Sequence, residues 1–146
     1  MTSFAHRCGI HDDARAAALS RAALLAGGLE LVRFAWCDVH GVTRGKTLVA
    51  GAAAKAMMDG VGMVSTLMLK DTSDRTAFKV FEPGGTADLP GFGQANNLLL
   101  LADPDSFRQL PWTPASGWVQ CQPWFQDGTP VELDTRSVLQ RALARL

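Results

Sequence analysis

Residues 41–47 (Gly-Val-Thr-Arg-Gly-Lys-Thr) end in the Gly-Lys-Thr sequence that is typical of phosphate-binding loops. Such a loop surrounds a phosphate with backbone N–H groups and leads directly into a helix N-terminus. Here only three residues separate Gly41 from Gly45 where the motif has four, and His40 occupies the position that the spacing reserves for glycine. An apolar run at residues 98–101 followed by Asp103 is compatible with a Walker B strand. A P-loop-like nucleotide binder is therefore one alternative, in which Lys46 would contact phosphate.

The second candidate for ion binding is the N-terminal group of His6, Cys8 and His11. Imidazole and thiolate groups are typical zinc ligands, but no second cluster completes a four-ligand set. We therefore expect a frayed, solvated terminus with no metal ligand.

Residues 71–93 form a polar segment that is interrupted by glycine and proline, in an otherwise apolar part of the chain. A long segment of this kind inside a compact domain is uncommon unless it is functional or disordered. We interpret it as the working loop, with disorder as the alternative.

A β-hairpin precedes this segment and is the element around which the rest is organised. Residues 29–37 place Val32, Phe34 and Trp36 alternately on one face, and residues 42–49 return beside them. Gly41 supplies the positive φ that a short connection requires. This interpretation competes with the phosphate loop for the same residues, and we favour the hairpin because residues 48–49 continue a strand.

Other elements follow from periodicity and capping. Asp12 or Asp13 begins a lightly packed helix that ends near residue 26, and an alanine-rich helix at residues 50–59 ends at Gly60, with Met57 and Met58 predicted to pack against a sheet. Strands are expected at residues 61–69, 96–102 and 117–125, with Pro123 marking an edge or a bulge. Asp134 begins a final helix that carries an apolar stripe and shows no terminating signal, so we expect the natural protein to continue.

Composition limits the classes of function. The chain has 146 residues, 47% of them hydrophobic, and a formal charge of zero at pH 7, which argues against a nucleic-acid or acidic-membrane partner. Three unpaired cysteines indicate free thiols in a reducing compartment. With no signal peptide and no apolar run of membrane-spanning length, we expect a cytoplasmic location.

The order of several motifs resembles the N-terminal domain of the glutamine synthetase family, in particular its glutamate–polyamine ligase branch, which includes gamma-glutamylputrescine synthetase-like enzymes. The resemblance covers about residues 29–146. It rests on Cys37-Asp38 with residues 41–46, on Asp71 after an apolar strand, and on Gly93 before the strand ending at Asp103. It also includes the Pro111-Trp112 pair and residues 134–139 (Asp-Thr-Arg-Ser-Val-Leu).

The resemblance implies an α+β fold: a β-grasp-like mixed sheet with a crossing helix, flanked by N- and C-terminal helices. It divides the chain into a tail and helix (residues 1–28), the β-grasp domain (29–133) and the start of a linker helix (134–146). A catalytic barrel would follow, holding ATP, Mg or Mn, and glutamate. Family members assemble into homo-oligomeric rings, so the implied partners are that barrel and neighbouring subunits, with glutamate and an amine as substrates. This chain alone is expected to be inactive.

The resemblance also implies the site residues. In the family, a loop with the sequence Asp-Gly-Ser-Ser is lent to the neighbouring subunit's active site, where its aspartate faces the ammonium and helps to deprotonate it. Residues 71–74 (Asp-Thr-Ser-Asp) correspond to it, which implies a catalytic Asp71 with Ser73 and Asp74 binding substrate. The aspartate and first serine match, whereas the glycine and final serine do not, and this favours an amine larger than ammonia. Arg44 and Lys46 match an Arg-Gly-Lys sequence and are assigned to the sheet surface or to subunit contacts.

A further alternative is a stand-alone, non-enzymatic β-grasp module that pairs with a partner through a sheet edge. In that case Asp71 would only begin a turn.

Overall fold

The computed structural model describes residues 2–10, 13–86, 89–93 and 96–146. In chain order its elements are α1 (Phe4–Arg7), α2 (Asp13–Ala26), β1 (Leu31–Cys37), β2 (Thr43–Val49), α3 (Ala50–Asp59), β3 (Val61–Val64), the 3-10 helix η1 (Ser65–Leu69), β4 (Asn97–Ala102), the 3-10 helix η2 (Pro104–Ser106), β5 (Arg108–Leu110), β6 (Thr113–Phe125) and α4 (Thr135–Leu143). None of the described helices is long and apolar enough to cross a membrane.

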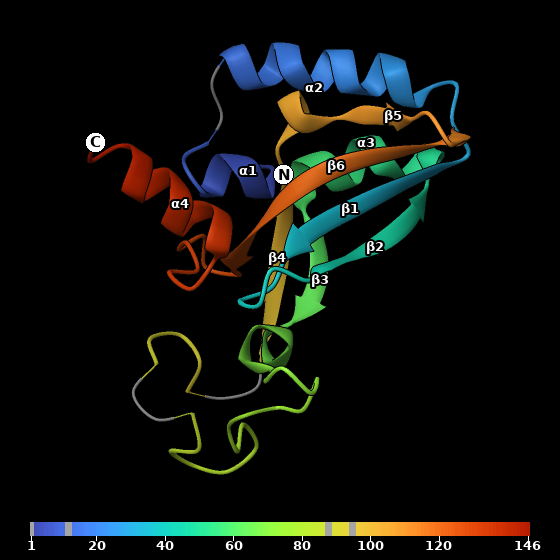
Figure 1. The fold of residues 1–146 in the computed structure, drawn as a ribbon. Helices are drawn as coiled ribbons and strands as arrows, with labels where there is room; N and C mark the ends of the chain where they lie inside the picture. The colour runs from blue at the N-terminus through green and yellow to red at the C-terminus, as the bar shows by residue number, and fades with distance from the viewer. Residues whose placement is uncertain (1, 11–12, 87–88, 94–95) are drawn as a thin grey trace.

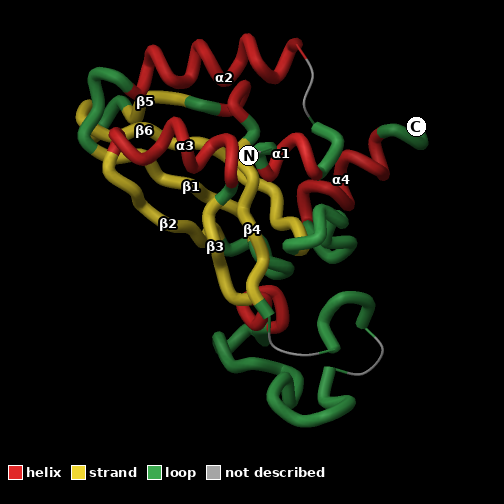
Figure 2. The backbone as a smooth tube through the Cα atoms, turned by 180° about the vertical axis from the view of Figure 1, so that it is seen from behind, coloured by secondary structure: helices red, strands yellow, loops and turns green. Residues whose placement is uncertain are grey.

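The strands form one mixed sheet in the order β2-β1-β6-β4-β3, with β5 pairing beside β6 (Figure 1). β1 runs parallel to β6, and the other pairs are antiparallel. α3 packs against β1, β2 and β4, and α2 packs in turn against α3 (Figure 2). A mixed sheet crossed by a helix and flanked by further helices confirms the predicted α+β, β-grasp-like class.

The core lies between the sheet and α3. Val32, Phe34 and Trp36 are all buried there, as the alternation predicts, together with Met57 of α3. The predicted packing role of Met57 is thus confirmed, whereas Met58 is only half-buried. Each fully buried side chain of this kind contributes about 1.5–3 kcal/mol, so this face is the main source of stability for the sheet.

The predicted hairpin is present and the phosphate-loop interpretation is wrong. β1 and β2 pair from Leu31↔Val49 to Cys37↔Thr43, so the Gly-Lys-Thr sequence lies within a strand and not at a helix start. Gly41 adopts φ 78° in the connection, as predicted. A Cβ at Gly45 would lie 2.3 Å from the Phe34 carbonyl oxygen, so this glycine permits close approach of the two strands. Asp103 caps η2 and pairs with Arg136.

The strand expected at residues 61–69 is only partly correct. β3 ends at Val64, and residues 65–69 form η1. The ladder ends because its partner β4 begins at Asn97, opposite Val64, and the Ser65 hydroxyl then accepts a hydrogen bond from the Asn96 backbone N–H. Without a strand to pair with, the apolar run turns, burying Met68 and Leu69.

β6 is longer than expected and begins four residues earlier, at Thr113 instead of 117. Its first half pairs with β1 as far as Gln120, and its second half pairs with β4 from Cys121 onwards. Pro123 therefore lies beyond Gln120, the last β6 residue that pairs with β1. Among the described strands, only β4 pairs with β6 at this position, so one side of Pro123 is a strand edge. This agrees with the edge position predicted for it.

The N-terminus departs from the expected frayed tail. Ser3 caps α1 by accepting a hydrogen bond from the His6 backbone N–H, and Phe4 and Ala5 are buried against Leu101. The aromatic side chain of Phe4, buried against Leu101 and close to Gly60 at the end of α3, thus holds the terminus in place. His11, one of the three residues considered as metal ligands, lies outside the described residues.

Both predicted flanking helices are present, although the last one ends at Leu143 and does not continue to Leu146 as expected. α2 spans Asp13–Ala26, and α4 begins after Asp134, whose buried carboxylate accepts hydrogen bonds from the backbone N–H and the hydroxyl of Ser137. The apolar stripe of α4 is exposed at Val138, Leu139 and Leu143.

Candidate functional site

The candidate site is a short turn at residues 70–76, which we call the Asp71 turn. It follows η1 and is closed by a bridge between Lys70 and Thr76. The Asp71 backbone N–H donates to the Arg75 carbonyl at 2.7 Å, and the Asp74 N–H donates to the Asp71 carbonyl at 3.0 Å. The segment expected to be either functional or disordered is therefore locally ordered at its start.

The Asp71 side chain holds the turn together through one oxygen. Oδ1 accepts hydrogen bonds from the Ser73 N–H at 2.9 Å, the Ser73 hydroxyl at 2.8 Å and the Arg75 N–H at 3.0 Å. Within the described part of the chain, every hydrogen bond to this carboxylate goes to Oδ1. Oδ2 is therefore the oxygen through which Asp71 can hold an external cation.

Hydrogen bonding fixes the charge on Asp71. The Arg75 N–H, followed by the Ser73 hydroxyl, holds the pKa of Asp71 below its usual range. The group is thus a carboxylate at neutral pH. A lowered pKa makes it a stable counter-ion for an ammonium group and a weak base.

The Asp71 turn is attached to the β1–β2 connection through Arg44. The Arg44 Nε donates to Asp38 Oδ2 at 2.7 Å, and its terminal Nη2 donates to Asp74 Oδ1, also at 2.7 Å. A second link joins the same two segments, since His40 Nε2 lies 2.8 Å from the Lys70 carbonyl oxygen. Arg44 is therefore not a solvated side chain of the sheet surface, because its guanidinium bridges two carboxylates, and its assignment to subunit contacts stays a prediction. Lys46 is exposed, as expected.

Asp38 is the anchor of this arrangement. It is completely buried, and its Oδ1 accepts hydrogen bonds from the His40 and Val42 backbone N–H groups, both at 2.9 Å. Burial alone would raise the pKa of Asp38, but the Arg44 guanidinium and the two backbone N–H groups outweigh it and hold the pKa below its usual range. The Asp38 hydrogen bond, followed by that of Asp74, raises the pKa of Arg44. Asp38 and Arg44 are thus both charged at neutral pH.

The structure brings the three predicted site residues together in one turn but gives them different partners. Asp71 is half-buried and Ser73 donates its hydroxyl to it, while Asp74 directs one carboxylate oxygen to Arg44. Asp74 adopts φ 62°, a left-handed conformation that Asp tolerates better than most residues. Their roles as catalytic and substrate-binding residues stay predictions.

Three residues of this arrangement were not identified from the sequence: Asp38, His40 and Lys70, whose ammonium group donates to the Asp74 carbonyl at 2.8 Å. For Asp38 a signal was available. An aspartate at the end of an apolar strand, three residues before a glycine, is typical of a side chain that accepts N–H groups in a turn. His40 carries no comparable signal, because the Lys70 carbonyl that it contacts lies 30 residues away, and the bond of Lys70 to Asp74, four residues on, was not anticipated.

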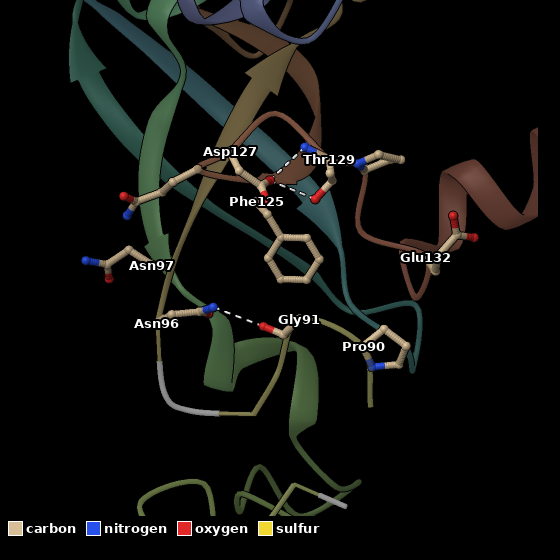
Figure 3. Close-up of a pocket in the computed structure, with 10 residues that line it drawn as sticks. Pro90, Gly91, Asn96, Asn97, Phe125, Asp127, Thr129 and Glu132 are labelled. Atoms are coloured by element: carbon tan, nitrogen blue, oxygen red, sulfur yellow. Dashed lines mark hydrogen bonds between the residues drawn. The ribbon is translucent and has the colours of Figure 1, made fainter. Parts of the chain in front are cut away.

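A separate cavity of about 650 Å³ lies at the same end of the sheet as η1, between the turn that follows β6 and the segment around Gly91 (Figure 3). Phe125 projects into it, and Asp127 and Glu132 lie on its rim. Asp127 Oδ1 accepts hydrogen bonds from the N–H and hydroxyl of Thr129, which close the predicted turn at residues 126–128. Most polar groups of this cavity thus serve local structure, and we assign no function to the cavity.

No metal centre is found in the part of the chain that the structure describes: no three His, Cys, Asp or Glu side chains there are grouped to hold an ion. The described cysteines Cys8, Cys37 and Cys121 are free thiols, as predicted. The site is therefore a carboxylate-bearing turn mounted on a hairpin.

Comparison with known proteins identifies relatives, although no family model matches the chain. It is 28% identical over 122 residues to gamma-glutamylanilide synthase of Acinetobacter sp, covering 82% of this chain and 24% of that protein. It is 26% identical to human lengsin (86% and 23% covered) and 24% identical to glutamine synthetase of Pyrococcus abyssi (80% and 22% covered). The chain thus spans about a quarter of the length of these relatives.

Solved structures give the same result at the level of the fold. The chain matches a structure described as a GmaS/ADP complex with a TM-score of 0.60 and 29% identity, covering 84% of this chain and 24% of that one. A structure described as a novel glutamine synthase homolog matches with a TM-score of 0.61 and 25% identity, covering 80% and 26%. Sequence relatives and fold agree, and together they support placing the chain in the glutamine synthetase family, as a β-grasp-like N-terminal domain.

Proposed function

We propose that this chain is the N-terminal part of an ATP-dependent ligase that joins glutamate to an amine, and that Asp71 holds the amine as its ammonium form. The observation that carries the proposal is the geometry of the Asp71 turn. A carboxylate with a lowered pKa is held in a closed turn, whose hydrogen bonds to it, within the described residues, all end on Oδ1. A cationic amine must be held by such a group before it loses a proton and attacks an acyl phosphate.

The amine is proposed to be larger than ammonia. Thr72 and Asp74 replace the glycine and final serine of the Asp-Gly-Ser-Ser sequence, and Asp74 is engaged by Arg44. Gamma-glutamylanilide synthase, one of the relatives, is by its name a synthase for a product with a larger amine than ammonia. In this proposal Ser73 supports Asp71 through its hydroxyl, and Asp74 contributes to amine binding by fixing the turn.

ATP and its divalent metal, Mg or Mn, are assigned to a catalytic barrel that would follow residues 134–146. One of the matched structures is described as an ADP complex, and the described residues of this chain offer no metal centre of their own. The Asp71 turn would then act in the active site of a neighbouring subunit in a homo-oligomer. The exposed apolar stripe of α4 supports a further packing partner for that helix.

The test is amine-dependent ADP release by a ligase-length protein that carries these residues at its N-terminus. With ATP, Mg²⁺ and glutamate present, we expect higher kcat/KM for methylamine, putrescine or aniline than for ammonia. Asp71→Asn should lower kcat/KM for the preferred amine about 100-fold, the low end for loss of a group acting on the reacting proton. Asp59→Asn, which removes a carboxylate paired with the exposed Lys55, is the matched control and should leave kcat/KM for that amine unchanged.

If no amine stimulates ADP release, the ligase proposal is wrong, and the stand-alone interaction module becomes the better explanation. If Asp71→Asn behaves like Asp59→Asn, the ligase assignment stands but Asp71 has no part in it.

A further inference from the structure

Arg44 joins two carboxylates that lie in different parts of the chain. Asp38 directly follows β1 and Asp74 belongs to the Asp71 turn, and each lies 2.7 Å from a different nitrogen of the same guanidinium. The Arg44 side chain is 22% exposed and that of Asp38 is not exposed at all, whereas that of Asp74 is 63% exposed. The bridge therefore runs from the buried core of the hairpin outwards to the turn.

We propose that Arg44 is a positioning residue, which fixes the Asp71 turn on the β1–β2 hairpin through the Asp38–Arg44–Asp74 bridge. The effect of this bridge on amine binding rests on the role proposed for Asp71. The fixing of the turn by the bridge does not depend on that role. Arg44 itself does not contact the amine in this proposal. It determines where Asp71 Oδ2 lies.

The chemistry of the bridge requires arginine. A guanidinium is planar and donates in several fixed directions, so that Nε and Nη2 can engage two carboxylates at once. A lysine at this position carries the same charge on a single nitrogen and has no second donor in a fixed direction. Arg44→Lys is therefore expected to keep the charge next to buried Asp38 and to lose the link to Asp74.

The inner half of the bridge is rigid, which makes it a suitable anchor. The Asp38 carboxylate is held by two backbone N–H groups of the hairpin connection as well as by Arg44. The outer half lies at the surface, where an isolated ion pair contributes little to stability. The geometry thus assigns different roles to the two pairs: Asp38–Arg44 stabilises the hairpin, and Arg44–Asp74 orients the turn.

The turn also has internal restraints, so loss of the bridge should loosen it and not unfold it. The Lys70 ammonium donates to the Asp74 carbonyl, and the His40 ring contacts the Lys70 carbonyl. Loosening of this kind speeds hydrogen exchange at the backbone amides of the turn and leaves exchange in the β1–β2 hairpin unchanged.

Asp74→Asn is the decisive variant. Asparagine has the same shape and also tolerates the left-handed φ at this position, and the Asp38–Arg44 pair is left intact. The variant removes the charge that binds Arg44 to the turn at 2.7 Å, and with it only the longer contact of 4.0 Å with Lys70 Nζ. Lys46→Ala is the matched control, since Lys46 lies two residues from Arg44 on the same strand and is exposed.

The experiment is hydrogen–deuterium exchange of the 146-residue chain, resolved for peptides covering residues 70–77 and 31–49. We expect Asp74→Asn and Arg44→Lys to increase amide exchange in the turn at least fivefold, with Lys46→Ala unchanged. Unchanged exchange in the turn for Asp74→Asn would overturn the proposal, as would an equal increase for Lys46→Ala.

Kinetics of the ligase-length protein separate this proposal from the proposed function. Asp74→Asn should raise KM for the amine about five- to tenfold and leave KM for glutamate unchanged. A turn that loosens without any change in amine kinetics would support the bridge and count against Asp71 as the amine-binding group.

Discussion

Asp38 and Asp71 are two carboxylates with lowered pKa values, and their surroundings give them different tasks. Asp38 is buried and fully occupied by Arg44 and two backbone N–H groups. Asp71 is half-buried and its hydrogen bonds converge on one oxygen. A saturated, buried carboxylate serves structure, while a partly exposed one with an oxygen to spare can serve a ligand.

The charge on Asp38 predicts a pH-dependent contribution to stability. Because its pKa is lowered in the folded state, the contribution is fully present above the ordinary pKa of about 4 and is lost as the pH falls through the folded value. We expect Asp38→Asn to lower the free energy of unfolding by about 2–3 kcal/mol at pH 7, because Arg44 loses its charged partner. The difference from the unmodified chain should shrink below pH 4.

Urea denaturation of the unmodified chain and of the Asp38→Asn variant, between pH 7 and pH 2, measures the difference in their free energies of unfolding. Glu82→Gln, an exposed carboxylate paired with Lys79, is the control and should track the unmodified chain throughout. A difference for Asp38→Asn that stays constant down to pH 2 would show that the charge of Asp38 is not the cause.

At the scale of elements, the hairpin carries the site. β2 supplies Arg44, and the connection between β1 and β2 supplies Asp38 and His40. The register Trp36↔Arg44 determines that Arg44 lies on the α3 face of the sheet, close to the end where η1 leads into the Asp71 turn. A shift of one residue in this pairing would send Arg44 to the opposite face.

The close approach of the strands at Gly45 gives a second prediction. A Cβ there would lie 2.3 Å from the Phe34 carbonyl oxygen and 3.1 Å from the Ala35 Cα, both backbone atoms that cannot move aside cheaply. We expect Gly45→Ala to lower the free energy of unfolding by about 2 kcal/mol, within the range for overpacking. Gly62→Ala in β3 is the matched control, because no atom lies within 4 Å of its added Cβ.

Thermal or urea denaturation of the two variants provides the comparison. A neutral Gly45→Ala would mean that β2 can withdraw from β1 without cost, and the register on which Arg44 depends would then be only weakly specified.

At the scale of the whole molecule, the domain is a sheet with one covered and one partly covered face, and the Asp71 turn lies at one end of it (Figure 1). The chain spans about a quarter of the length of its relatives, and α4 presents Val138, Leu139 and Leu143 to solvent. An amine-holding carboxylate alone cannot activate glutamate, since phosphoryl transfer needs a phosphate clamp and a metal.

We therefore expect the 146-residue chain by itself to release no ADP in response to glutamate and an amine. A coupled assay for ADP with putrescine or aniline measures this, and the ligase-length protein serves as the positive control. Activity in the short chain would overturn the assignment of ATP chemistry to a following barrel. ATP binding that is abolished by Lys46→Ala would revive the phosphate-loop alternative, which the strand conformation of residues 43–49 contradicts.

The sequence by itself determined the elements whose signals are local. The alternation of Val32, Phe34 and Trp36, the glycine at 41 and the aspartate cap at 134 are each read within a few residues, and the hairpin and the final helix form where they predict. The strand predicted at residues 61–69 is too long. The composition of this run fits a strand, but the length of a strand depends on its partner, and β3 ends at Val64. β4 begins too late to pair with residues beyond Val64.

Only the tertiary structure decided how the candidate site is built. Asp71, Ser73 and Asp74 were identified by resemblance, but the partner of Asp74 is an arginine 30 residues earlier, and that contact exists only because the fold brings the segment after η1 beside the hairpin connection. The same holds for the parallel pairing of β1 with β6 and for the burial of Phe4. Local sequence determines which residues become helix or strand, whereas the partner of a side chain depends on which distant strands lie next to each other.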